Sequence, residues 1–221
     1  PQRIHVVGSP GLDHLRRRSL LERDELEQAL GARLGPRNLL LTFHSVTLEH
    51  DHGRSQLDEL LAALDGLPQD IVVWATRPNA DTGGRQIAAT LDAWVSRQGP
   101  RAHVYTSLGQ LRYLSLMALV DAVVGNSSSG LYEAPSLGVP TVDIGNRQAG
   151  RLAANSVVRA APSRSDIRKA IDTALALDCS NVVNPYGDGR TAARVNSILR
   201  SLPPAPDLLR KRFHLIEEHH G

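Results

Sequence analysis

Short apolar runs alternate with longer amphipathic stretches along almost the whole chain. Runs such as residues 39–43 and 71–75 are continuous and brief, as strands buried on both faces are. Stretches such as residues 55–64 and 85–97 repeat their apolar residues at helical spacing. This alternation predicts βαβ units around a parallel sheet.

The pattern places each expected element on the chain. Strands are expected at residues 4–7, 39–43, 71–75, 103–105, 122–124, 141–144 and, more weakly patterned, 157–160. Helices are expected at residues 20–34, 55–64, 85–97, 109–119, 128–137, 165–177 and 191–201. Ser19 and Glu22 have capping-box spacing for the first long helix. The fold class predicted is α/β, a doubly wound Rossmann-like sheet whose ligand lies at the carboxyl ends of the strands.

Composition narrows the class of protein. A chain of 221 residues with 41% hydrophobic and 22% charged residues is typical of a globular domain in water. The net charge of +2 gives no electrostatic reason to expect nucleic acid or a membrane as partner. Cys179 is a single cysteine, so no disulfide framework is expected, and the cytoplasm is the predicted compartment. The first residues lead straight into an expected strand, so we expect further sequence upstream.

Three adjacent serines, Ser127 to Ser129, follow an apolar run and open an expected helix. The first N–H groups of a helix have no partner within it, so such a junction can bind an anion. Glu133 follows in the same helix, where its carboxylate could accept hydrogen bonds from ribose hydroxyls. The alternative is an ordinary helix cap with no ligand.

A second turn carries positive charge. Residues 145–151 follow the strand at 141–144 and include Arg147 and Arg151. Parallel strands end at one edge of the sheet, so both turns would face one crevice. Together they predict a nucleotide-diphosphate site, whereas either turn alone could be ordinary polar surface.

His44 ends the second expected strand, in a loop that also holds His50, Asp51 and His52. A phosphate nearby would favour the charged imidazole, which could assist departure of a nucleotide. The three loop residues lack the spacing of a metal site, so no metal is expected. The sequence has no GxGxxG, Walker A or GxSxG motif, so dinucleotide, ATP and serine-esterase chemistry are not supported.

Several segments resemble the hydrolysing UDP-N-acetylglucosamine 2-epimerases, in the same order along the chain. They are VGSPGLD (7–13), TFHSVT (42–47), PNAD (78–81), SLG (107–109), YLSL (113–116), NSSSGLYEAPSLGVPTVDIGNRQAGR (126–151) and NPYGDG (184–189). The resemblance covers the C-terminal half of such an enzyme and implies a two-domain, glycosyltransferase-B-like architecture without cofactor. It implies elimination of UDP to a 2-acetamidoglucal and addition of water to give N-acetylmannosamine, a step of sialic acid or amino-sugar biosynthesis.

The resemblance also assigns residues. Ser127 and Ser128 match diphosphate-binding serines, Glu133 the ribose carboxylate and Arg147 a phosphate-binding arginine. His44 matches the active-site histidine, although Ser45 stands where many relatives carry proline. The backbone at Ser107 and Leu108 matches the loop that brackets the uracil, and Asn79, Asp81 and Arg151 match motif positions of unassigned role. The chain has neither the Arg-Glu pair after the histidine nor the Ser-Gly-Gly turn of the non-hydrolysing branch.

These matches divide the chain into two expected parts. Residues 1–202 would form the UDP-binding domain, and residues 203–221 a helix that reaches toward an absent N-terminal domain. Leu209, Phe213 and Ile216 would share one face of that helix, which could instead pack on its own domain.

The matched segments contain no carboxylate pair for proton transfer at the sugar, so the chain alone is expected to bind UDP and UDP-sugars without turnover. The full-length enzyme is expected to be a homo-oligomer, and the open alternatives are a glycosyltransferase domain or a stand-alone UDP-sugar binding module.

Overall fold

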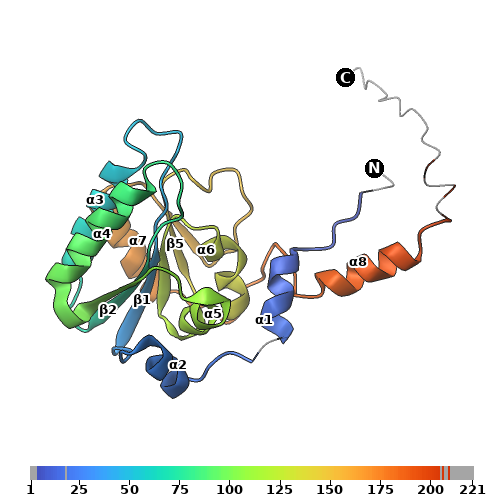
Figure 1. Ribbon diagram of the computed structural model, residues 1–221, viewed down its shortest axis with the longest axis horizontal. Coiled ribbons are helices and arrows are strands. Elements are labelled where there is room, and N and C mark those ends of the chain that lie inside the picture. The colour runs from blue at the N-terminus through green and yellow to red at the C-terminus, as the bar shows by residue number, and fades with distance from the viewer. Residues whose placement is uncertain (1–3, 18, 205, 207–208, 210–221) are drawn as a thin grey trace.

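The computed structural model describes residues 4–17, 19–204, 206 and 209. Six parallel strands form one sheet in the order β3-β2-β1-β4-β5-β6, which is the doubly wound order of the Rossmann fold (Figure 1). The strands are β1 (Arg37–Thr42), β2 (Ile71–Thr76), β3 (Ala102–Tyr105), β4 (Ala122–Gly125), β5 (Thr141–Ile144) and β6 (Val157–Ala160). The helices are α1 (Asp13–Arg17), α2 (Arg23–Leu30), α3 (Arg54–Asp65), α4 (Gly84–Gln98), α5 (Gly109–Leu119), α6 (Ser129–Tyr132), α7 (Arg164–Leu175) and α8 (Thr191–Arg200).

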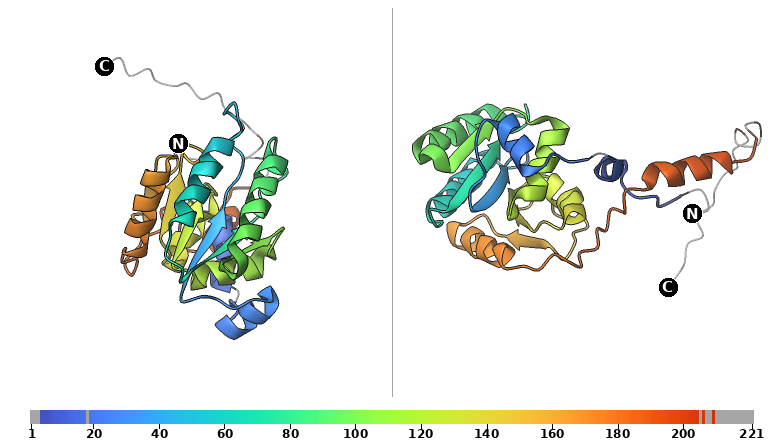
Figure 2. Two further views of the ribbon diagram at one scale, coloured as in Figure 1. Left: turned by 90° about the vertical axis from the view of Figure 1, so that its left-hand side faces the viewer. Right: turned by 90° about the horizontal axis from the view of Figure 1, so that it is seen from below.

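Helices cover both faces of the sheet, as Figure 2 shows. Successive strand residues point to opposite faces, so Leu39 and Leu41 of β1 pack with α3, α4 and α7, whereas Leu40 packs with α2 and α5. All three leucines are fully buried. Strand β1 pairs with β2 on one side and with β4 on the other. The strand order reverses direction between β1 and β4, so the switch point of the sheet lies there.

The predicted strand at residues 4–7 is wrong. Ile4 and Val6 are 77% and 97% exposed, and the segment is held by the later part of the chain instead of by the sheet. Ser9 N–H donates to the Tyr186 carbonyl at 2.7 Å, and Arg194 Nη1 donates to the Val7 carbonyl at 3.4 Å. An alternating pattern is compatible with a strand, but a strand also needs a neighbour to pair with and a face to bury.

Two predicted helices are shorter than expected. The helix expected from residue 20 begins at Arg23 and ends before Gly31, whose φ of 70° stops it. Its capping interaction comes from Glu22, whose N–H donates to the Glu25 carboxylate at 3.1 Å, and not from Ser19. The helix expected over 128–137 is the single turn α6 followed by a 3₁₀ turn over Ala134–Leu137, because Pro135 has no N–H to continue it.

The segments α1 and α8 lie beside the sheet domain and not against its faces (Figure 1). The Asp13 carboxylate accepts hydrogen bonds from the N–H groups of Thr191 and Ala192, at 2.9 and 2.7 Å, and so caps α8. Thr191 is the one buried residue of α8, while Leu199 is 60% exposed. None of the helices in the described ranges is both long and apolar enough to cross a membrane.

Candidate nucleotide site

The carboxyl ends of β1 and β4 bring His44 and the serine segment together. Asn126, fully buried, joins the two strand ends: its Oδ1 accepts the His44 N–H at 2.7 Å, and its Nδ2 donates to the His44 carbonyl at 2.8 Å. The predicted residues His44, Ser127 and Ser128 therefore lie at the switch point of the sheet, where ligands of this fold bind.

The His44 imidazole is buried and neutral in the described chain. Burial and, to a smaller degree, the nearby Arg147 lower its pKa to about 4, although Asp81 opposes the shift. Its Nδ1 accepts the Asn79 N–H at 3.2 Å, so the neutral ring carries its proton on Nε2. The Nε2–H group is therefore a neutral donor in the site without an anion, and the charged imidazole expected beside a phosphate stays a prediction.

The serine segment is organised by side-chain hydrogen bonds. Ser129 Oγ donates to Ser127 Oγ at 3.0 Å and lies 2.7 Å from the Tyr113 hydroxyl. Tyr113 in turn lies 3.2 Å from Thr42 Oγ1, at the end of β1. Because α6 is a single turn, its macrodipole is weak, and the hydroxyls and first N–H groups are what an anion would meet here.

Glu133 stands at the end of α6 and is partly buried. Burial raises the pKa of its carboxyl group to about 7. A carboxyl group with this pKa exists in both protonation states near neutral pH. Partners that donate hydrogen bonds, such as hydroxyl groups, would favour the ionised state.

Arg147 reaches back over the end of β4 from the turn after β5. Gly145 allows this turn with a φ of 72°, and a Cβ at that position would meet Gln56 Oε1 at 2.6 Å. Arg147 Nη1 donates to the Asn126 carbonyl at 3.2 Å. Burial lowers the pKa of the guanidinium while Asp81 opposes the shift, so a partly desolvated cation faces the crevice.

Asp81 and Arg147 line one cavity of about 290 Å³, together with residues 45–49 and Asn146. Asn79 contributes its N–H to His44, as described above. Both positions of unassigned role therefore belong to the surroundings of the histidine. Asp81 is exposed, as a group that meets a ligand or another domain would be.

The remaining predicted residues lie around this centre. Ser107 is exposed at the start of α5, and its Oγ accepts the Gly109 N–H at 3.2 Å. The Leu108 side chain is 3% exposed in the core, so only its backbone could meet a base. Arg151 is exposed, with its guanidinium carbon 6.0 Å from the Tyr132 ring centre. Neither Ser107 nor Arg151 contacts His44 or Arg147 through a hydrogen bond that the structure describes.

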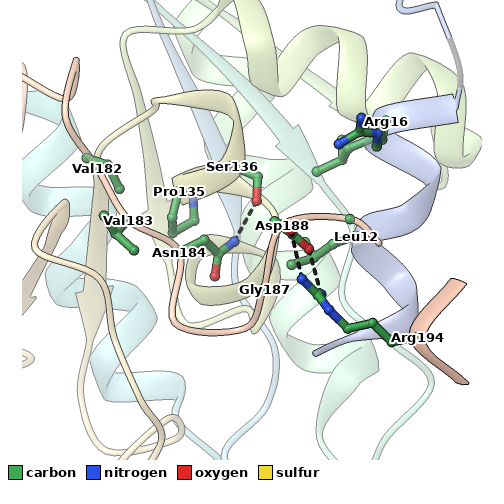
Figure 3. A pocket seen from close by; sticks show the side chains of 12 residues that line it. Leu12, Arg16, Pro135, Ser136, Val182, Val183, Asn184, Gly187, Asp188 and Arg194 are labelled. Carbon is green, nitrogen blue, oxygen red and sulfur yellow. Dashed lines mark hydrogen bonds and ion pairs between the residues drawn. The ribbon is translucent and has the colours of Figure 1, made fainter. Parts of the chain in front are cut away.

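A larger cavity of about 640 Å³ lies elsewhere, between α1, the 3₁₀ turn and residues 182–189 (Figure 3). Four of its polar residues form two pairs: Asn184 Nδ2 donates to Ser136 Oγ at 2.6 Å, and Arg194 binds Asp188 at 2.7 Å. None of the predicted site residues lines it. The cavity lies between α1 and residues 182–194 of the later chain, and we do not assign it to the nucleotide.

Asp51 organises the loop after His44. The Asp51 carboxylate accepts hydrogen bonds from Gly53 and Ser55, and those from Ser55 are the main reason its pKa falls to about 2. Asp51 therefore closes the turn before α3. In the part of the chain that is described, no cluster of three His, Cys, Asp or Glu side chains could hold a metal ion.

Sequence reasoning did not assign roles to Asn126, Tyr113 or Gln148. All three lie inside segments that carry the resemblance, so the motifs contain them. Their roles depend on contacts between strand ends far apart in the chain, such as the bond from Gln148 Nε2 to the Asn126 carbonyl at 2.8 Å. Sequence spacing alone does not reveal such contacts.

Known proteins resemble this chain over most of its length. It is 32% identical over 157 residues to a hydrolysing GDP/UDP-N,N'-diacetylbacillosamine 2-epimerase of Campylobacter jejuni, covering 71% of this chain and 41% of that protein. It is 29% identical to a hydrolysing UDP-N,N'-diacetylbacillosamine 2-epimerase of Legionella pneumophila, covering 94% of this chain and 54% of that protein. The chain thus spans about half the length of these curated relatives.

Solved structures share the fold. The UDP-GlcNAc 2-epimerase of Methanocaldococcus jannaschii, solved in complex with UDP-GlcNAc and UDP, superposes with a TM-score of 0.67 at 14% identity. The match covers 90% of this chain and 55% of that one. The fold is therefore Rossmann-like, as predicted, and its structural neighbours are of the glycosyltransferase-B type. The sequence model of the UDP-N-acetylglucosamine 2-epimerase family matches residues 1–200, and the chain belongs to that family.

Proposed function

We propose that the chain is the UDP-binding half of a hydrolysing UDP-N-acetylglucosamine 2-epimerase. The whole enzyme would convert UDP-N-acetylglucosamine and water into N-acetylmannosamine and UDP. The observation that carries the proposal is the convergence of His44, the serine segment and Arg147 on the switch point between β1 and β4. Family membership and the UDP complex of a structural neighbour support it.

Each group has a part in binding the nucleotide. Ser127 and Ser128 donate to the diphosphate, and Arg147 supplies positive charge that is already partly desolvated. Glu133 accepts hydrogen bonds from the ribose, and the backbone at Ser107 and Leu108 brackets the uracil. With these roles, the diphosphate would lie over the ends of β1 and β4.

His44 assists departure of UDP. As negative charge builds up on the leaving diphosphate, the Nε2–H group can donate a hydrogen bond to it, and the same charge raises the imidazole pKa. Burial and the Asn79 hydrogen bond hold the ring in one orientation. The cavity bounded by Asp81 and Arg147 adjoins this point and would receive the sugar side of the substrate.

The remaining chemistry belongs to a second domain. Removal of the proton at C2 of the sugar needs a positioned base, and addition of water needs a second acid–base group. The carboxylates that line the cavity beside His44 in the described chain are Glu49 and the exposed Asp81, and Glu49 already accepts a hydrogen bond from Gln56 Nε2. The exposed apolar residues Ile4, Val6 and Leu199 would meet that domain, and residues 203–221 would reach onto it.

The test is binding and turnover with the 221-residue chain. Calorimetry should show UDP binding that is lost or weakened in Arg147→Ala and in Glu133→Ala, while assays for free UDP release show no turnover. Both UDP-N-acetylglucosamine and UDP-N,N'-diacetylbacillosamine belong in the assay, because curated relatives are named for the latter. UDP affinity that is the same in both variants would disprove the site, and robust turnover would disprove the division between two domains.

Glutamate 133 gives a further check on the orientation of the nucleotide. If its carboxylate accepts ribose hydroxyls, Glu133→Gln should weaken UDP more than 2′,3′-dideoxy-UDP. A glycosyltransferase domain or a stand-alone binding module would bind UDP in the same way. An assay for N-acetylmannosamine with the natural full-length protein separates these from an epimerase.

A further inference from the structure

Asn126 joins the two functional segments of the site through five hydrogen bonds. It is fully buried, and its N–H donates to the Thr42 carbonyl at 3.2 Å. Its side chain both accepts from His44 N–H and donates to the His44 carbonyl. Its own carbonyl accepts Arg147 Nη1 at 3.2 Å and Gln148 Nε2 at 2.8 Å.

The pattern departs from a regular parallel ladder. Thr42 pairs with Gly125, and the bond from Asn126 N–H to the Thr42 carbonyl continues that ladder. The next bond of a parallel ladder would run from His44 N–H to the Asn126 backbone carbonyl. The Asn126 side-chain amide takes that place instead, because its Oδ1 accepts the His44 N–H at 2.7 Å.

This replacement leaves the Asn126 backbone carbonyl for the turn after β5. A carbonyl oxygen has two lone pairs, and here Arg147 and Gln148 occupy both. If the side-chain amide were absent, the His44 N–H would compete for the same oxygen. The side chain therefore decides whether this oxygen holds the histidine strand or the arginine turn.

We propose that Asn126 is the positioning residue of the site, whose side-chain amide holds His44 so that its backbone carbonyl can hold Arg147. The role of these two residues toward UDP rests on the proposed function, but their coupling through Asn126 does not. Asn126 itself need not touch the ligand. It sets the spacing between a neutral proton donor and a cation that would act on one diphosphate.

The first experiment compares Asn126→Ala with Asn38→Ala. Asn38 is the matched control, since it is also buried in the protein, bonds backbone groups through its side-chain amide, and lies at the opposite end of β1. Calorimetry should show that Asn126→Ala weakens UDP roughly tenfold to a hundredfold, the usual effect of losing a charged hydrogen bond. Asn38→Ala should lower the thermal midpoint and leave the UDP affinity of the folded protein unchanged. Equal effects of both on UDP affinity would overturn the proposal.

A double-mutant cycle tests the coupling to Arg147. If Asn126 acts by holding Arg147, the loss of UDP affinity from Asn126→Ala should largely disappear in the Arg147→Ala background. Additive losses would mean that Asn126 acts independently of Arg147, which contradicts the proposal.

The imidazole of His44 provides a readout that needs no UDP. In the unaltered chain Arg147 helps to lower the His44 pKa, so Arg147→Ala should raise that pKa in an NMR titration. In the Asn126→Ala background the same substitution should have a smaller effect. If UDP fails to bind the unaltered chain, the proposed function fails, while this titration still decides whether Asn126 couples the two residues.

Asn126→Asp keeps the test valid should the alanine variant not fold. The introduced carboxyl group can still accept the His44 N–H, but only its protonated form can donate to the His44 carbonyl. UDP affinity relative to the unaltered chain should therefore recover as pH falls and the new group takes up a proton. A deficit that is independent of pH, or no deficit at all, would contradict the proposal.

Discussion

At the amino end of β1, Asn38 accepts the Gly35 N–H and the Trp74 Nε1–H and donates to the Gly35 carbonyl. At the carboxyl end, Asn126 makes the same kind of two-way bond to the His44 backbone. The difference lies in what surrounds them. Next to Asn38, Arg37 forms a bidentate ion pair with Asp70, at 2.8 Å for each bond, and the pKa of Asp70 falls as it does for a paired carboxylate.

Around Asn126, burial shifts the pKa values of Glu133 and His44 toward their uncharged forms, in contrast to the ion-paired Asp70. Burial raises the pKa of Glu133 to about 7 and lowers that of His44 to about 4. The buried Gln148 Oε1 and Asp143 Oδ1 have no hydrogen-bond partner among the described residues. One end of the strand is satisfied internally, and the other keeps polar groups in states that an incoming ligand can change. We therefore expect residues at the amino end of β1 to affect mainly stability, and residues at its carboxyl end to affect mainly ligand binding.

The largest expected effect is on stability, at the amino end. Asn38→Ala leaves the buried Trp74 Nε1–H and two Gly35 backbone groups without their partner, which should cost about 2–4 kcal/mol in the free energy of unfolding. Urea unfolding measures this loss. UDP affinity measured well below the transition should not change, and a change would show that the two ends are coupled.

Arg147→Ala should have the converse effect at the carboxyl end. Loss of a charged partner should weaken UDP binding by about 1.5–3 kcal/mol. The free energy of unfolding should remain the same or rise slightly, since burial already disfavours this cation in the folded chain. Arg23→Ala is the control, because among the described residues Arg23 pairs with Glu27 on the surface of α2. A large loss of stability in Arg147→Ala would make the arginine a structural residue.

Glu133→Gln tests the carboxyl end through pH. The folded pKa of about 7 lies above the ordinary 4.5, so ionisation is disfavoured in the folded state. The stability contributed by the protonated acid is present below about pH 4.5 and is lost as pH rises through about 7. The variant should therefore be more stable than the unaltered chain at about pH 8, by roughly 1–3 kcal/mol, and not at about pH 4.

The same group should release a proton when UDP binds. Ribose hydroxyls that donate to the carboxylate would lower its pKa, so calorimetry near neutral pH in buffers of different ionisation enthalpy should detect proton release. Glu133→Gln removes this contribution and isolates any proton uptake by His44. Equal proton release in both proteins would show that the carboxylate does not meet the ribose.

A smaller effect is expected from Tyr113→Phe. Its hydroxyl links Ser129 at the start of α6 with Thr42 at the end of β1. Loss of one such neutral link should weaken UDP by about 0.5–1.5 kcal/mol. Ser129→Ala should remove the same link, so the double variant should lose little more than either single one. Fully additive losses would show that the two hydroxyls act separately.

Much of this organisation could be predicted from sequence, because its causes are local. Apolar runs of strand length and helical periodicity placed all six strands of the sheet, and the strand order follows from doubly wound topology. His44, Ser127 and Arg147 were found because each follows a strand. The wrong prediction at residues 4–7 arose because a short apolar run does not say whether a sheet edge is available.

The parts that sequence could not give depend on long-range contacts and on solvation. The bond between Asn126 and His44 joins positions 82 apart in the chain, and no local pattern signals that an amide will replace a ladder bond. The neutral state of His44 in the site without an anion depends on burial, which outweighs the effect of Asp81 and which no local pattern reveals. The predicted face of Phe213 and Ile216 lies outside the described residues, so its docking stays a prediction.

The smallest expected effect is that of deleting residues 203–221. The hydrophobic core around β1 is expected to be complete without residues 203–221. Leu209 within the segment is 79% exposed, and Leu202, the residue before it, is 41% exposed. Removing the segment should therefore change the thermal midpoint by less than about 2 °C.

Deletion from residue 190 onward is the matched control. It removes the Thr191 and Ala192 N–H groups that the buried Asp13 carboxylate accepts, at 2.9 and 2.7 Å, and leaves that charge without its partners. This deletion should lower the midpoint clearly, because the hydrogen bonds that α8 donates to Asp13 and the buried side chain of Thr191 are lost with it. If the shorter deletion were as damaging as the longer one, residues 203–221 would belong to the core of this domain. The segment would then not be available to a second domain, and the stability of both ends of β1 would have to be measured with it in place.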